Sequence, residues 1–63
     1  MQFTFEGPAG LPSENGAIVC WRRGEAERPA FTWSGHEWIG SDGSVLPTAM
    51  LADRFEWWER VVE

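Results

Sequence analysis

Alternating polar and apolar residues predict a short β-strand at the start of the chain. Over residues 2–6, two phenylalanines would share one face and the polar residues the other, as a half-buried strand requires. Residues 7–16 are rich in Gly, Pro, Ser and Asn, which favour turns. The apolar run that follows predicts a second strand over residues 17–21.

A hairpin is predicted farther along, with Ser34 and Gly35 as its loop. Residues 30–33 and 36–39 flank this pair as the third and fourth strands, and Ser-Gly fits a two-residue loop. One face of the hairpin would then carry Phe31, Trp33, His36 and Trp38. A turn over residues 41–43 leads to a further short strand at 44–46. The predicted register pairs Trp33 with His36, Thr32 with Glu37, Phe31 with Trp38 and Ala30 with Ile39.

The period of the apolar residues changes after Pro47 and indicates a helix. Thr48 is the expected N-cap, and the apolar residues that follow fall within an arc of about 160° at helical spacing. We therefore expect a helix that continues to the end of the chain. The alternative ends the helix near Arg54 and makes residues 56–62 a closing strand, because Trp and Val favour strands and no glycine marks a helix end.

These elements predict a single α+β domain that spans residues 1–63. An antiparallel sheet of three to five short strands would be packed by one C-terminal helix. A domain of this size buries only about 60% of the surface that its unfolded chain exposes. Large aromatic side chains are therefore expected to supply most of the core, and the chain has five tryptophans and four phenylalanines.

The charges and the N-terminal residues narrow the class of protein. Ten acidic residues and five arginines give a net charge of −5, which repels a phosphate backbone and argues against general nucleic-acid binding. Residues 1–8 have neither the basic nor the apolar region of a signal peptide, and no apolar run approaches the length of a membrane span. We therefore expect a soluble, cytoplasmic protein without a membrane partner.

Few side chains in the sequence are suited to catalysis or metal binding. Cys20 lies in an apolar strand, where a buried, unreactive thiol is expected, and His36 is the only histidine. The sequence offers no nucleophile with a base and an orienting group, and no CxxC or HxxxH spacing. Gly40–Gly43 matches no phosphate-binding loop. We expect a non-enzyme with no catalytic residue, metal or cofactor.

Binding is the remaining class of function, and two groups of residues are its candidates. The hairpin face with Trp33, His36 and Trp38 is either the core side of the sheet or an exposed recognition platform. The aromatic side chains exceed what a core of this size usually holds, so at least one Trp is expected to be exposed or to lie in a self-association interface. The second group either binds a phosphate or carboxylate or is solvated. It comprises Arg22, Arg23 and Arg54.

Two segments and the end of the chain share residues with a known family. Trp33–Ile39 is followed by Thr48–Asp53, and later by a Trp and the ending Val-Val-Glu. In this order they resemble a small phage protein family whose members include anti-Thoeris sponges. The resemblance implies an oligomer that sequesters a cyclic ADP-ribose-type signal. That family opens with a helix, where this chain has Gly7 and Pro8.

The sequence supports three hypotheses of function. The first is a small, non-enzymatic, phage-type protein that binds and inhibits a host or defence protein stoichiometrically in the host cytoplasm, with an exposed Trp cluster and an acidic rim as its contact surface. The second is a sponge for a cyclic nucleotide immune signal, in which Trp33 or Trp38 stacks on a base and arginines contact phosphates across a subunit boundary. The third is a structural component of a virion or larger assembly, which would form stable homo-oligomers.

Overall fold

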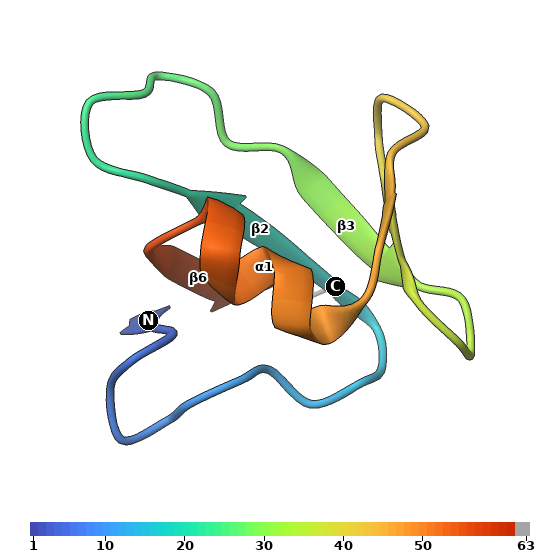
Figure 1. Cartoon of the computed structure of the whole chain (residues 1–63), viewed down its shortest axis with the longest axis horizontal. Helices are drawn as coiled ribbons and strands as arrows, with labels where there is room; N and C mark the ends of the chain where they lie inside the picture. Colours follow the sequence, from blue (N-terminus) through green and yellow to red (C-terminus); the bar gives the residue numbers. More distant parts are fainter. Residues whose placement is uncertain (62–63) are drawn as a thin grey trace.

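Six short strands form one antiparallel sheet in the order β1-β6-β2-β3-β4-β5 (Figure 1). The computed structural model describes residues 1–61. Strands β2 to β5 pair with their neighbours in the chain, and β6 returns to lie between β1 and β2. The elements are β1 (Gln2–Thr4), β2 (Ala17–Trp21), β3 (Ala30–Trp33), β4 (Trp38–Gly40), β5 (Val45–Leu46), α1 (Thr48–Arg54) and β6 (Trp57–Arg60).

The predicted α+β class is confirmed, and the sheet has six strands rather than three to five. Strands β2 and β3 have the predicted bounds, whereas β1, β4 and β5 are shorter than expected or displaced. The prediction of a helix to the end of the chain was wrong, because α1 ends at Arg54 and residues 57–60 form β6. Residues 57–60 pair with both β1 and β2, and this pairing outweighs the helical spacing of the apolar residues in this segment. Residues 62–63, which the predicted helix included, lie outside the described residues.

The β3–β4 hairpin closes with a longer loop than predicted. Trp33 pairs with Trp38 rather than with His36. In the loop, the Ser34 hydroxyl accepts a hydrogen bond from the backbone N–H of Glu37 (3.2 Å) and donates one to the Glu37 carbonyl oxygen (2.9 Å), which favours the longer loop. Since the register moves by an even number of residues, the aromatic residues of both strands keep their predicted common face, but His36 leaves the strand.

The hydrophobic core lies on one face of the sheet, where α1 and the N-terminal segment cover it (Figure 1). The principal extents of the molecule are 26, 25 and 24 Å, so the sheet curves around this core rather than lying flat. Leu51 is the buried residue of α1, and Phe5, in the segment after β1, is buried in the same core. The core side chains are Phe5, Ile18, Cys20, Phe31, Trp38, Leu46, Leu51 and Trp58.

Two buried tryptophans tie the covering segments to the sheet. The Trp38 indole N–H on β4 donates to the Thr48 hydroxyl at the start of α1 (2.9 Å), and that hydroxyl donates to Glu14 (3.1 Å). The Trp58 indole N–H on β6 donates to the carbonyl oxygen of Gly10 (3.1 Å). The prediction of Thr48 as the N-cap was therefore wrong. Helix α1 has no side-chain cap, and the Thr48 hydroxyl accepts the hydrogen bond of Trp38 instead.

Replacing Thr48 by Val should lower the free energy of unfolding by about 1–3 kcal/mol, because the buried Trp38 N–H loses its acceptor. The substitution preserves the shape of the side chain, and Thr48→Ser, which keeps the hydroxyl, is its control. Urea denaturation followed by Trp fluorescence measures both variants. Equal stability of the Val and Ser variants would show that this hydrogen bond does not hold the helix in place.

Cys20 should make the protein less stable as the pH rises from about 9 toward 12. Burial raises the pKa of its thiol from 9.0 to about 12, so between these values the unfolded chain binds fewer protons than the folded one. The free energy of unfolding then falls by up to about 1.4 kcal/mol per pH unit. The chain has neither Tyr nor Lys, the side chains other than Cys whose ordinary pKa lies near 10.

Urea denaturation at a series of pH values measures this slope, with Cys20→Ala as the comparison. The Ala variant is expected to start from a lower stability and to show no loss between pH about 9 and 12. The same slope in both proteins would contradict the assignment of the effect to the Cys20 thiol.

Candidate functional site

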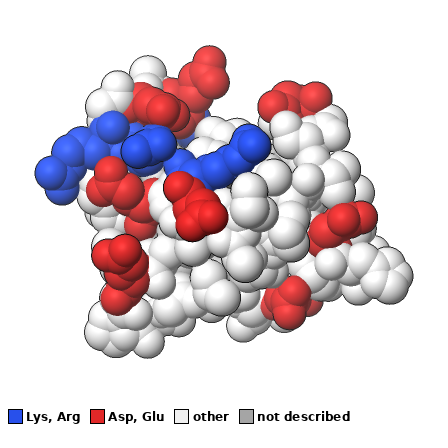
Figure 2. Space-filling view, viewed as in Figure 1, with Lys and Arg blue, Asp and Glu red and all other residues white. Residues whose placement is uncertain are grey.

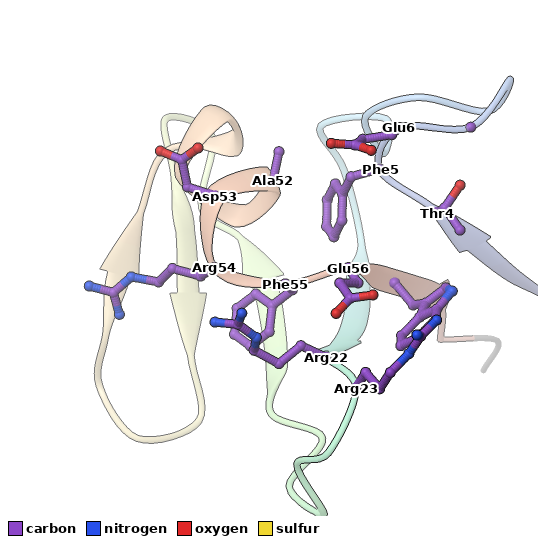
Figure 3. Close-up of a pocket in the computed structure, with 12 residues that line it drawn as sticks. Thr4, Phe5, Glu6, Arg22, Arg23, Ala52, Asp53, Arg54, Phe55 and Glu56 are labelled. Atoms are coloured by element: carbon purple, nitrogen blue, oxygen red, sulfur yellow. The ribbon is translucent and has the colours of Figure 1, made fainter.

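The three arginines predicted as binding residues line one groove of about 530 Å³ (Figure 3). Arg22 and Arg23 follow the end of β2, and Arg54 is the last residue of α1. The backbone N–H of Glu56 donates to the carbonyl oxygen of Trp21 (3.1 Å), which holds the segment after α1 against the end of β2. We call this the arginine groove. Its lining consists of residues 4–7, 22–23 and 52–57.

The guanidinium groups of the arginine groove have no hydrogen bond or ion pair to residues 1–61. Glu6, Asp53 and Glu56 line the same groove. The one ion pair within the described chain joins the amino group of Met1 to Glu59 (2.9 Å). Figure 2 shows the arginines as a band across one face, with acidic residues around it. The donors of these arginines are thus available to a ligand.

Arg22 and Arg23 extend in different directions, although they are adjacent in the sequence. Arg22 extends past Phe55, and Arg23 points to the other side (Figure 3). The guanidinium carbon of Arg23 lies 5.7 Å from the centre of the Trp57 ring, a distance typical of a cation–π contact. Both side chains line the arginine groove.

Trp57 belongs to an aromatic stack on the face of the sheet opposite the core. It pairs with Trp21 across β6 and β2, and their rings stack with centroids 6.3 Å apart. The guanidinium carbon of Arg28 lies 4.4 Å from the centre of the Trp21 ring. This explains why Trp21 is buried without being part of the core cluster, and it gives Trp57 a fixed position beside the arginines.

A second groove of about 390 Å³ adjoins the first and shares four lining residues with it. We call it the acidic groove, because the charged residues that it does not share are all acidic: Glu25, Glu27 and Asp42. The backbone N–H of Ser44 donates to Asp42 (2.9 Å) and lowers the pKa of the Asp42 carboxyl, with a smaller contribution from the charge of Arg54. Asp42 therefore stays ionised at neutral pH.

The aromatic candidates of the hairpin line neither groove. Trp38 is fully buried, edge-on to the half-buried Trp33 (5.2 Å), so this face of the hairpin is the core side of the sheet. His36 is exposed in the hairpin loop. The backbone N–H of Trp33 donates to Gly16, just before β2, whereas Arg22 follows the other end of that strand. Within a single copy of the chain, Trp33 and the arginines of the arginine groove therefore lie apart.

The sequence interpretation missed Phe55 and Trp57 as site residues. It placed both on the apolar face of a long helix, where core packing was expected. The strand preference of Trp and Val after residue 56, which supported the alternative of a closing strand, was the signal that could have located them. With the helix ended at Arg54, both residues fall beside the end of β2.

Comparisons with known proteins give no match: no protein-family model, curated protein or solved structure is similar to this chain. The resemblance to the sponge family stays a prediction. Within residues 1–61, no three His, Cys, Asp or Glu side chains are grouped so as to hold a metal ion. No helix in that range combines the length and apolar character needed to cross a membrane.

The arginines of the groove should contribute little to stability. We expect Arg22→Gln and Arg54→Gln to change the free energy of unfolding by less than about 0.5 kcal/mol, because neither side chain has a bonding partner among the described residues. Arg60→Gln is the contrast. Arg60 donates to the carbonyl oxygens of Ser13 and Asn15, so its replacement should lower the free energy of unfolding by about 1–2 kcal/mol. The midpoints of urea unfolding, compared at equal m-values, measure these differences in the free energy of unfolding. A cost for Arg22→Gln or Arg54→Gln as large as that for Arg60→Gln would assign these arginines a structural role.

Proposed function

We propose that this protein is a small, non-enzymatic, phage-type binding protein that acts stoichiometrically on a host or defence protein, with the arginine groove as its contact surface. One observation carries the proposal. Arg22, Arg23 and Arg54 line a single groove together with the half-buried Trp57, and their guanidinium groups are unpaired within the described chain. Inhibition would follow from occupation of the partner's own binding surface in the host cytoplasm.

The residue types of the groove favour a protein partner. Arg and Trp are the side chains most enriched among the energetic hot spots of protein interfaces. A guanidinium group offers a planar set of donors that matches a carboxylate in a bidentate geometry, and Trp57 adds apolar surface next to it. A volume of about 530 Å³ admits a few side chains of a partner. The groove would therefore receive an anchor that contains a carboxylate.

The charge around the groove indicates what surrounds that anchor on the partner. The chain has a net charge of −5, and acidic side chains flank the band of arginines (Figure 2). Complementary potentials speed up association and suppress wrong partners. We infer that the partner presents an acidic anchor within a basic surface.

A second candidate function, the cyclic nucleotide sponge, is favoured by the same groove. Trp57 offers a ring on which a base can stack, and the arginines offer donors to phosphates. In this hypothesis the base would stack on Trp57 rather than on Trp33 or Trp38. Binding of a cyclic nucleotide that is released intact would distinguish this function from protein binding.

Affinity capture from a host-cell lysate tests the leading proposal. We expect wild-type protein to retain one protein, and Arg22→Gln and Arg54→Gln each to weaken its capture at least tenfold, about 1.4 kcal/mol. Arg28→Gln is the matched control, because it removes the same charge but lies outside the arginine groove, over Trp21. The captured protein, once purified, should be inhibited at an equimolar ratio.

Two results would contradict protein binding through this groove. One is the same set of captured proteins for the wild type, the groove variants and Arg28→Gln. The other is no captured protein together with reversible binding of a cyclic nucleotide that Arg22→Gln abolishes, which would establish the sponge.

A further inference from the structure

The arginine groove and the acidic groove adjoin, and we call the two together the trough. Arg22, Asp53, Arg54 and Phe55 line both grooves, and we call the wall formed by these shared residues the ridge. One end of the trough lies at the turn after β1, and the other at the turn between β4 and β5. The volumes of about 530 and 390 Å³ each admit a few side chains. A single ligand can therefore occupy both.

Charge is distributed unevenly along the trough. At the ridge, Arg22 and Arg54 line both grooves together with one carboxylate, Asp53, so the arginines outnumber the acidic residue there. Beyond the ridge, the acidic groove adds three carboxylates and no further basic residue, which makes that end negative. The arginine groove adds Arg23 together with Glu6 and Glu56, so the charges at its end are closer to balance. A ligand that matches this pattern has an anion at the ridge and a cation in the acidic groove.

Apolar side chains also line the trough. Phe55 at the ridge is half-buried and meets Phe31 edge-on (5.7 Å), so one side of its ring belongs to the core and the other is open to a ligand. Beyond it, Phe5, Ala52 and Trp57 line the arginine groove. This end matches an apolar side chain.

The arrangement of two adjoining grooves suits an extended segment, because each groove admits a few side chains. An extended chain advances about 3.3 Å per residue and alternates its side chains, so every second side chain faces the same surface. Such a chain can place the side chains of residues i, i+2 and i+4 in the arginine groove, at the ridge and in the acidic groove.

Building on the proposed function, we propose that the trough binds an extended segment of the partner protein that carries an apolar, an acidic and a basic side chain at alternate positions. The apolar side chain occupies the arginine groove beside Trp57. The acidic side chain lies at the ridge against Arg22 and Arg54, and the basic one lies against Glu25, Glu27 and Asp42.

Selection from a library of random dodecapeptides displayed on their own mRNA tests this assignment with the full-length protein. We expect enriched peptides to carry an apolar, an acidic and a basic residue within a short window. Arg22→Gln and Arg54→Gln should each weaken the binding of a selected peptide at least tenfold. Neutralising the acidic residue of the peptide should then weaken its binding to these variants little further. Glu27→Lys should weaken the preference for a basic residue in the acidic groove, because it replaces one of the three carboxylates there by an ammonium group. Glu37→Gln, in the exposed hairpin loop and outside both grooves, is the control for Glu25→Gln and Glu27→Gln.

The outcomes separate this inference from the proposed function. Enriched peptides without a basic residue, or peptide binding that Glu25→Gln and Glu27→Gln leave unchanged, would overturn the bipolar segment. Enrichment of no peptide by the wild type would overturn an extended segment as the ligand. In either case, loss of lysate capture in Arg22→Gln and Arg54→Gln would still support the proposed function, and unchanged capture would overturn that as well.

Discussion

A buried indole N–H needs an acceptor, and in this protein that requirement joins the sheet to the segments that cover it. Trp38 finds its acceptor in Thr48, and Trp58 finds its acceptor in Gly10. The first hydrogen bond fixes where α1 begins, and the second fixes the N-terminal segment over β6. Because a buried donor without a partner costs about 1–3 kcal/mol, a small domain with a single cysteine gains both stability and a unique arrangement from these two contacts.

The position of α1 determines the candidate site. With its start held at Trp38, the short helix ends at Arg54, and the chain returns beside the end of β2. This return brings Arg54 and Phe55 next to Arg22, which is distant from them in the sequence. On the opposite face, the stack of Trp21 and Trp57 orders the other side of the groove. Core packing and the site thus depend on the same few tryptophans.

Local pattern was sufficient to predict much of the fold. Strands β2 and β3 and the aromatic face of the hairpin follow from alternation, and a register error of two residues left that face unchanged. The end of the helix did not follow from local pattern, because Trp57 and Trp58 fit both periods and only pairing with β1 and β2 decides between them. The hairpin loop was underestimated because Ser34 bonds with Glu37 stabilise a longer turn.

The candidate site was predictable in part. Arg22, Arg23 and Arg54 were identifiable as candidate ligand-binding residues from their chemistry, but their shared groove depends on where α1 ends. The carboxylates of the acidic groove come from two loops, residues 25–27 and Asp42, whose proximity no sequence spacing reveals. Trp38 was a reasonable candidate for recognition on composition alone. Its complete burial follows from the packing of α1 on the sheet, a tertiary effect.

We propose that a partner protein binds at the trough rather than on the outer face of the β3–β4 hairpin. Photo-crosslinking in host cells tests it most directly, with p-benzoylphenylalanine placed either at Ala52, exposed in the arginine groove, or at Ile39, exposed on the outer face. We predict a crosslink to one protein from position 52 and none from position 39. A crosslink from position 39 alone, or from neither position, would contradict the claim.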